Sequence, residues 1–265
     1  MKNILVPVDF SNASSNALSY ALNLFNSKDL KITLLNVFST KSTALMMKNI
    51  DDVLFKDSKQ QMERLLKKFE ADYPDVTFTP KILKNYPVDT IVEFSKTKDY
   101  DFIVMGTKGA SGLKEVFMGS IAGGVVARAL KPTIVVPDGY KFNGLNTVVL
   151  AVSDQTFENL DILSPVRDVA LDQESELILL HITNGEMPQL EQVKSLMEDV
   201  NPKVDFSYGS GNVNKDLNEY LEKKKSGMVC MIRGKKSFMN RLLDKSATMK
   251  QTFSSPVPLM ILHDE

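Results

Sequence analysis

The sequence predicts an α/β protein made of two tandem, doubly wound domains, each with a five-stranded parallel sheet. Three observations predict this fold class. Short apolar runs alternate with amphipathic stretches along the chain, as expected where helices connect buried strands. The apolar runs show little polar alternation, which is typical of parallel strands buried on both faces. The whole series then repeats once, and 265 residues are enough for two domains of ordinary size.

The first series begins with a strand at Asn3–Val8 and continues with a helix. Apolar residues of this helix recur at helical spacing from Ala17 to Phe25, and Ser11 or Asn12 is its predicted N-cap. Because consecutive parallel strands are joined by right-handed crossovers, the following elements should build one sheet with helices on both faces. They are the strands Ile32–Val37, Val76–Ile82, Phe102–Met105 and Thr133–Val136, and the helices Asp51–Glu70, Pro87–Thr97 and Ser120–Leu130.

The second series follows a connecting segment that contains Gly and Asn, between Asp138 and Asn146. We therefore place one domain at residues 1–140 and the other at residues 147–265. Thr147–Val152 corresponds to the first strand, and Phe157–Leu171 corresponds to the first helix. The other predicted elements are the strands Leu177–Ile182, Lys203–Tyr208, Met228–Ile232 and Pro258–Leu262, and the helix Val213–Lys224.

Composition excludes several classes of partner. The chain has 32 Lys and Arg against 33 Asp and Glu, for a formal net charge of −1. This balance offers no basic field to nucleic acid or to an anionic membrane. The single Cys230 lies in an apolar run and leaves no internal disulfide, which suits a reducing compartment. Asp9 follows only a short apolar run, without a signal peptide or a membrane span, so we expect a cytoplasmic protein.

A glycine-rich loop follows the strand Phe102–Met105 and leads into a helix. Gly106 comes directly after the strand, where a glycine allows a turn with positive φ and a close approach of the backbone to a ligand. Gly119 and Ser120 open the next helix, whose first amides lack intrahelical partners. Strand, loop and helix start together predict a cradle for phosphate. The loop is neither a Walker A motif nor a compact GxGxxG, and a purely structural connection is the alternative.

The spacing G-x2-G-x9-G-S, on Gly106, Gly109, Gly119 and Ser120, resembles the nucleotide-binding signature of the universal stress protein family, in its ATP-binding branch. The opening Val6–Ser11, which reads VPVDFS, is also similar to the first strand and helix of that family. The resemblance is strong in residues 1–140 and weak in residues 147–265. It implies a Rossmann-like, adenine nucleotide alpha hydrolase-like fold and ATP as the ligand, together with Mg²⁺.

The resemblance also implies roles for individual residues. Asp9 would accept a hydrogen bond from the ribose or the adenine, and the backbone of Val37 would meet the adenine. Lys108 would reach the terminal phosphates, while Ala122 lacks a hydroxyl that some relatives place there. The full set of residues implied to bind the nucleotide is Pro7, Val8, Asp9, Val37, Met105, Gly106, Lys108, Gly109, Gly119, Ser120, Ile121 and Ala122. For Asp9, Val37 and Lys108, ordinary roles in a helix start, a core and a solvated loop are the alternatives.

The two series differ in chemistry. When Ser246 is aligned with Ser120, the three glycine positions of the loop become Ile232, Lys235 and Lys245. These side chains cannot reproduce a close backbone approach to a ligand. We therefore expect the second domain to keep the fold, to lack the nucleotide site, and to leave one ATP site per chain.

Three functions are compatible with these patterns. The first is an ATP-binding universal stress protein that acts as a stress-response regulator or sensor. The second is a slow ATPase or nucleotidyl-transfer enzyme on the same fold, and the third is a nucleotide-free dimerisation module. His181 and His263 belong to no triad, and no HExxH or CxxC motif is present. We favour the first function, without catalysis.

Finally, the two fifth strands predict a contact between the domains. Thr133–Val136 and Pro258–Leu262 are both apolar, and an unpaired apolar edge strand is an aggregation hazard. Single-domain relatives pair through these strands, and a tandem chain can make the contact within itself. We therefore expect intramolecular pairing across a pseudo-two-fold axis. A further homodimer of whole chains stays open.

Overall fold

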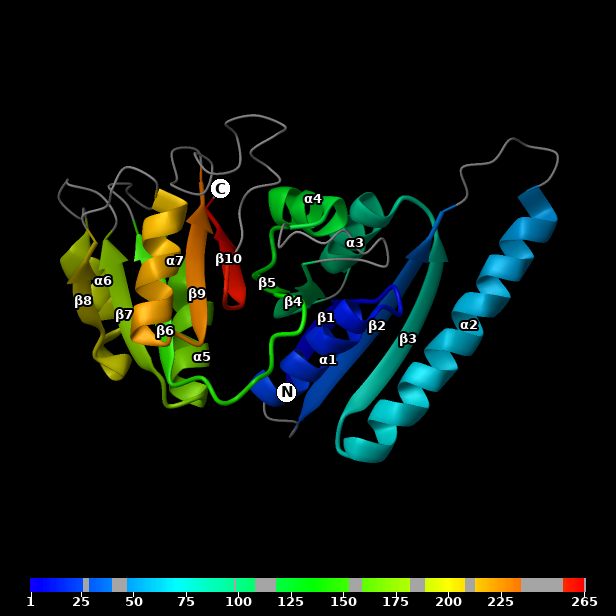
Figure 1. Ribbon diagram of the computed structural model, residues 1–265, viewed down its shortest axis with the longest axis horizontal. Coiled ribbons are helices and arrows are strands. Elements are labelled where there is room, and N and C mark those ends of the chain that lie inside the picture. Colours follow the sequence, from blue (N-terminus) through cyan, green and yellow to red (C-terminus); the bar gives the residue numbers. More distant parts are fainter. Residues whose placement is uncertain are drawn as a thin grey trace.

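In the N-terminal half, residues 1–140, strands and helices alternate as the sequence predicts (Figure 1). The computed structural model describes residues 1–25, 29–39, 47–97, 99–107, 118–152, 159–181, 189–207, 213–234 and 255–264. The strands of this half are β1 (Lys2–Pro7), β2 (Leu30–Phe38), β3 (Thr77–Lys84), β4 (Phe102–Gly106) and β5 (Thr133–Val136). The helices are α1 (Asn12–Leu24), α2 (Met47–Asp72), α3 (Pro87–Thr97) and α4 (Ser120–Arg128).

The C-terminal half, residues 147–265, repeats this series with shorter helices. Its strands are β6 (Thr147–Val152), β7 (Glu176–His181), β8 (Lys203–Phe206), β9 (Met228–Arg233) and β10 (Leu259–His263). Its described helices are α5 (Ser164–Asp172), α6 (Leu190–Leu196) and α7 (Val213–Lys224), with 3₁₀ turns at η1 (Leu160–Leu163) and η2 (Glu198–Val200). The first helix starts later than the predicted Phe157, which lies outside the described residues. Pro165, which donates no amide hydrogen, stands in the first turn of α5, where helices accept it.

All ten strands belong to one sheet, in the order β3-β2-β1-β4-β5-β10-β9-β6-β7-β8. Within each half every described strand pair is parallel, which confirms the predicted α/β fold class. The fifth strands of the two halves, which the sequence predicts to pair, are hydrogen-bonded to each other and antiparallel. Leu259 lies opposite Val135, and Ile261 lies opposite Thr133. Neither fifth strand is therefore an edge, and the sheet ends at β3 and β8.

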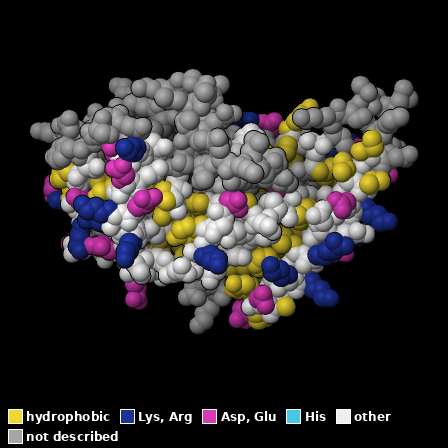
Figure 2. Space-filling model, in the orientation of Figure 1, with side chains coloured by type: hydrophobic (Ala, Val, Ile, Leu, Met, Phe, Trp, Pro, Cys, Tyr) yellow, Lys and Arg dark blue, Asp and Glu magenta, His cyan; other side chains and the backbone are white. Residues whose placement is uncertain are grey.

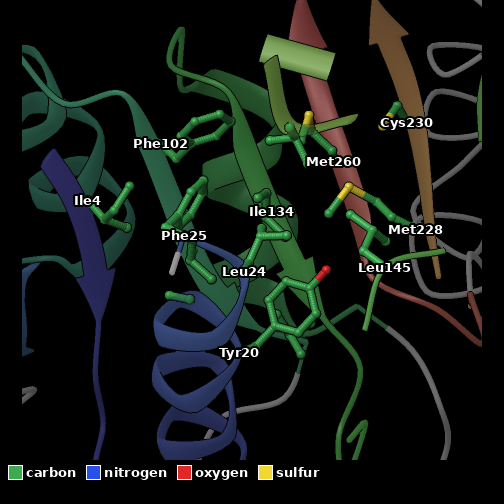
Figure 3. Packing of buried hydrophobic residues seen from close by; sticks show 14 of the residues in the cluster. Ile4, Tyr20, Leu24, Phe25, Phe102, Ile134, Leu145, Met228, Cys230 and Met260 are labelled. Atoms are coloured by element: carbon green, nitrogen blue, oxygen red, sulfur yellow. The ribbon is translucent and has the colours of Figure 1, made fainter. Parts of the chain in front are cut away.

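Alternate residues of each strand enter two different cores. On β1, Ile4 and Val6 pack on the face covered by α1 and α2, whereas Leu5 packs on the face covered by α3 and α4. The first core continues across the pairing of β5 and β10. Figure 3 shows Tyr20 of α1 and Ile134 of β5 in the same cluster as residues of the C-terminal half. The apolar cluster therefore joins the two halves in addition to the strand pairing.

The segment that connects the halves, residues 137–146, packs along the same core. Leu145 is only 2% exposed, and the Tyr140 hydroxyl donates a hydrogen bond to the Gly227 carbonyl at 3.2 Å. The Tyr20 ring meets the Tyr140 and Phe142 rings edge to face, at centroid distances of 5.9 and 5.5 Å. This connection is thus part of the folded interface rather than a loose tether.

The surface agrees with the balanced composition. On the face shown in Figure 2, Lys and Arg side chains are interspersed with Asp and Glu, and no field of one sign covers the coloured atoms. None of the helices in the described part of the chain has the length and the apolar character that crossing a bilayer requires.

The thiol of the single cysteine should be unreactive while the protein is folded. Cys230 of β9 is completely buried, and burial raises the pKa of its thiol far above the ordinary value. Because the thiolate is the reactive form, we expect no reaction with a thiol reagent at a pH of about 8 and full reaction in denaturant. Titration with Ellman's reagent, with and without guanidinium chloride, measures the reactive thiol of the unfolded and of the folded protein. Rapid labelling of the native protein would contradict the buried position.

His263 at the end of β10 should make stability depend on pH. Burial, followed by the charge of neighbouring Arg233, lowers the pKa of His263 to about 4. The unfolded chain binds this proton near a pH of about 6.5, and the folded chain does not. The free energy of unfolding should therefore fall as the pH drops from about 6.5 to about 4. Urea unfolding of the wild type and of His263→Gln should show a smaller fall in the variant. Equal falls in the two proteins would contradict this origin.

Candidate functional site

A pocket of the N-terminal half lies at the carboxyl ends of β1, β2 and β4, beside the first turns of α1, α3 and α4. In open parallel sheets this end is the usual place for a ligand. The described lining residues are Pro7, Val8, Asp9, Ser14, Leu35, Val37, Pro87, Ile91, Met105, Gly106, Thr107, Gly119, Ser120, Ile121 and Ala122. The site thus combines an apolar part, one carboxylate and the start of a helix.

Asp9 is held in place by the start of α1. Its Oδ1 accepts hydrogen bonds from the Ser11 amide at 3.1 Å and from the Ser11 hydroxyl at 2.6 Å. Ser11 is the N-cap of α1, and its hydroxyl oxygen accepts from the Ser14 amide at 3.2 Å. Phe10 between them has a φ of 64°, which turns the chain sharply from β1 into the helix. The carboxylate is therefore oriented before any ligand arrives.

The residue before Asp9 is fixed by β2. The Val8 amide donates to the Leu35 carbonyl at 2.9 Å, and the buried Asn36 side chain donates from Nδ2 to the Val8 carbonyl at 2.8 Å. Asn36 does not line the pocket, but it anchors the peptide that carries Asp9. The sequence analysis missed this residue. A polar side chain within the apolar run Ile32–Val37 was the signal that could have found it.

The start of α4 offers donors to an anion. Its N-cap is Gly119, which has no side chain that could bond the first amides of the helix. The Gly119 amide itself donates to the Thr107 carbonyl at 2.6 Å, so that the end of β4 and the start of α4 are tied together. The amides of Ser120, Ile121 and Ala122 follow in the first turn, where no intrahelical acceptor exists. Together with the positive end of the helix dipole, they present hydrogen-bond donors and partial positive charge to the pocket, the features that suit an anion.

Gly106 is required for a different reason from the one that the sequence suggests. We expected positive φ, yet Gly106 is not among the glycines of the described chain that adopt it, which are Gly139 and Gly144. A Cβ atom at Gly106 would lie 2.9 Å from the carbonyl oxygen and 3.0 Å from the carbonyl carbon of Ala13. The glycine therefore allows the first turn of α1 to pack against the end of β4, where Gly106 itself lines the pocket.

The apolar part of the pocket comes from β2 and α3. Leu35 and Val37 of β2 face Pro87 and Ile91, which belong to the first turns of α3. Such a surface suits a flat, uncharged ring system better than it suits phosphate. The sequence analysis places α3 correctly but assigns it no part in the site. The sequence carries no direct signal for this role, because it follows from the strand order of the folded sheet, in which the crossover from β3 to β4 carries α3 over β2 and β1.

The pocket brings together most of the residues that the sequence analysis assigns to the nucleotide. Lys108 and Gly109 lie outside the described residues. The lining residues that the assignment lacks are Ser14, Leu35, Pro87, Ile91 and Thr107. The assigned residues that line the pocket are Pro7, Val8, Asp9, Val37, Met105, Gly106, Gly119, Ser120, Ile121 and Ala122.

The C-terminal half has no glycine at the position of Gly106. Ile4 pairs with Phe102 in the first half and Val148 pairs with Met228 in the second, so the strand registers place Ile232 at this position. Ile232 is 4% exposed and packs within the first core. The other two positions of the aligned loop, Lys235 and Lys245, lie outside the described residues.

Comparison with known proteins identifies the family of the chain from its N-terminal half. The model of the universal stress protein family matches residues 1–137. A universal stress protein of Methanocaldococcus jannaschii is 30% identical over 138 residues, which cover 51% of this chain and 81% of the relative. A second one from the same organism is 28% identical over 156 residues, which cover 51% of this chain and 94% of the relative.

The fold is similar to a known structure along its whole length. The crystal structure of a universal stress protein from Archaeoglobus fulgidus superposes with a TM-score of 0.77 and covers 99% of this chain and 96% of its own chain. The identity is 21%, so this likeness concerns the fold. It includes the C-terminal half, which lies outside the residues that the family model matches.

Replacing Gly106 tests the contact between α1 and β4. Because the nearest atoms are backbone atoms of Ala13, they cannot move aside as the end of a flexible side chain would. Gly106→Ala should therefore lower the free energy of unfolding by about 1 to 3 kcal/mol, the range of overpacked sites. Gly123→Ala is the matched control, since a Cβ atom there meets only the Met118 sulfur at 3.9 Å. Urea unfolding should show the control to be as stable as the wild type or more stable. A Gly106→Ala protein of unchanged stability would contradict the contact.

Proposed function

Because the chain belongs to the universal stress protein family, we propose that its N-terminal half binds an adenine nucleotide, specifically ATP, and that the protein acts as a nucleotide-binding regulator or sensor. The observation that carries the proposal is the uncapped start of α4, which faces the oriented carboxylate of Asp9 in one pocket. The proposal treats residues 1–140 as the nucleotide-binding domain and residues 147–265 as its companion domain.

The phosphates belong at the start of α4. The amides of Ser120, Ile121 and Ala122 would donate to phosphate oxygens, and these charge-assisted bonds are stronger than bonds between neutral groups. Gly119 keeps the entrance to these amides clear of side-chain atoms. Lys108 and Gly109 of the preceding loop are proposed to complete the phosphate site.

The nucleoside belongs at the opposite end of the pocket. Asp9 is proposed to accept a hydrogen bond from the ribose or the adenine, because Ser11 already holds the carboxylate in position. The adenine ring would lie against Val37, Leu35, Pro87 and Ile91, whose apolar surface favours a flat base. This arrangement places the charged and the apolar ends of the ligand against matching surfaces.

Mg²⁺ is proposed to accompany the nucleotide rather than to occupy a site of its own. Among the described residues, no three His, Cys, Asp or Glu side chains gather as ligands for a metal. Asp9 is the carboxylate of the described lining. When bound, Mg²⁺ would neutralise part of the phosphate charge, and it is usually held by phosphate oxygens, water and only one or two carboxylates.

A slow ATPase on the same site is the second candidate. The residues of the pocket offer positioning and electrostatic stabilisation, which also assist phosphoryl transfer. We propose binding without efficient turnover, because binding energy without a group that acts in the transition state does not accelerate a reaction. Phosphate release above about one per minute at saturating ATP, a rate still below that of a typical enzyme, would favour the ATPase.

Gly119→Val should abolish tight ATP binding while the fold survives. Gly119 has a φ of −60° and a ψ of 161°, which any residue adopts, but the valine side chain would occupy the entrance to the α4 amides. Loss of one or two charge-assisted hydrogen bonds should lower the affinity for ATP, measured by calorimetric titration, by about 10-fold to 100-fold or more. Gly123→Val, one turn further along α4 and outside the pocket lining, should bind as the wild type does.

The same titration gives the stoichiometry of the wild type, which we expect to be near one ATP per chain. Unchanged affinity of a folded Gly119→Val protein would remove the α4 start from the site. A stoichiometry near two would show that the C-terminal half also binds the nucleotide.

A further inference from the structure

Of the three helices that begin at the pocket, α1 and α4 end against the C-terminal half. The first turns of α1 and α4 supply Ser14 and Ser120 to the pocket lining. At their other ends, each helix receives a hydrogen bond from a side chain of the C-terminal half, Gln173 or Arg233. The companion domain therefore touches the proposed nucleotide site indirectly, through the helices that build it.

Arg233 holds the end of α4. It is the last residue of β9, and its Nη1 donates to the Val126 carbonyl at 3.2 Å. The helix ends at Arg128, and the Ala129 amide bonds the Val125 carbonyl, so the Val126 carbonyl is the next one that the helix leaves without an internal amide donor. A guanidinium group at this end also meets the negative pole of the helix dipole.

Gln173 holds the end of α1 in the same way. It follows α5, and its Nε2 donates at 2.7 Å to the carbonyl of Leu24, the last residue of α1. An ion pair between Lys2 and Asp172 lies beside this contact. Near the ends of α1 and α4, a carbonyl therefore accepts a hydrogen bond from a side chain of the other half.

We infer that the C-terminal half positions the nucleotide site of the N-terminal half, with Arg233 and Gln173 as its positioning residues. The inference rests on the proposed function, because it takes the α4 start as the phosphate site. A helix of nine residues is a rigid rod of about 13 Å, so a displacement at Val126 moves the amides at Ser120. Phosphate hydrogen bonds tolerate little displacement, and binding should therefore depend on the contact at the far end of the helix.

The coupling between the Arg233 contact and nucleotide binding must be reciprocal. If Arg233 strengthens nucleotide binding through α4, the bound nucleotide must strengthen the Arg233 contact by the same free energy. A structural cap without influence on the site has no such reciprocity. Ligand-dependent protection inside the C-terminal half is therefore the property that distinguishes a positioning residue from a cap.

The first test compares ATP affinity in full-length variants by calorimetric titration. Arg233→Met keeps an unbranched side chain and removes the donor and the charge, so the dissociation constant should rise about fivefold or more, the lower limit for coupled sites. Arg233→Lys restores a charged donor and should recover part of the affinity. Arg167→Met is the matched control, because its described ion pairs join Asp168 and Asp199 within the C-terminal half, and it should bind as the wild type does.

The outcomes separate this inference from the proposed function. If the wild type fails to bind ATP, the proposed function is wrong. If the wild type binds and Arg233→Met binds equally well, the positioning role is wrong, even where the variant melts at a lower temperature. Gln173→Leu, which removes the donor at α1, should weaken binding in the same direction.

The second test needs no variant and covers the case in which Arg233→Met does not fold. Amide hydrogen exchange of the wild type is measured with and without saturating ATP. Protection should increase by at least about twofold in β9, while β8, at the far edge of the sheet, should remain unchanged as the internal control. Equal exchange in β9 with and without bound ATP would overturn the inference.

Discussion

The antiparallel pairing of β5 with β10 is the contact on which the rest of the architecture depends. Only three residue pairs align along it, from Leu259–Val135 to Ile261–Thr133, yet they turn two five-stranded sheets into one. The pairing brings β9 close enough for Arg233 to reach α4 and brings α5 close enough for Gln173 to reach α1. The apolar core then runs through the seam without interruption. Short strands suffice here because both are buried, and water does not compete for their backbone groups.

Much of the fold is readable from the sequence, because buried parallel strands and amphipathic helices carry distinct periodicities. The bounds predicted for β5 and α7 agree with the structure to the residue. The start of the site at Gly119 and Ser120 is also visible, since helix starts with glycine are a local pattern. Pro87, Ile91 and Asn36 escaped notice because their roles depend on which elements meet in space. The importance of Gly106 was recognised for the wrong reason, because a packing distance to Ala13 has no local signature.

The two halves illustrate how a fold and a binding site make different demands on a sequence. The fold needs apolar side chains at alternate strand positions, and both halves supply them. The pocket depends on two residues without a side chain. Gly106 allows the close approach of a helix, and Gly119 leaves the backbone amides of α4 accessible. Ile232 at the first of these positions is buried in the core. The same strand position can therefore serve packing by a side chain in one half and close approach of a helix in the other.

The packed connection between the halves has a kinetic consequence. The segment between β5 and β6 is anchored at two points, because Leu145 is buried and the Tyr140 hydroxyl donates a hydrogen bond to the Gly227 carbonyl. Each half therefore meets its own partner at an effective concentration that no second chain can match in dilute solution. Exchange of halves between molecules, which produces domain-swapped dimers, requires the connecting segment to open as a hinge. In this chain, Tyr140 and Leu145 of that segment are held at the interface instead. The pairing is thereby built into the covalent chain and does not respond to dilution.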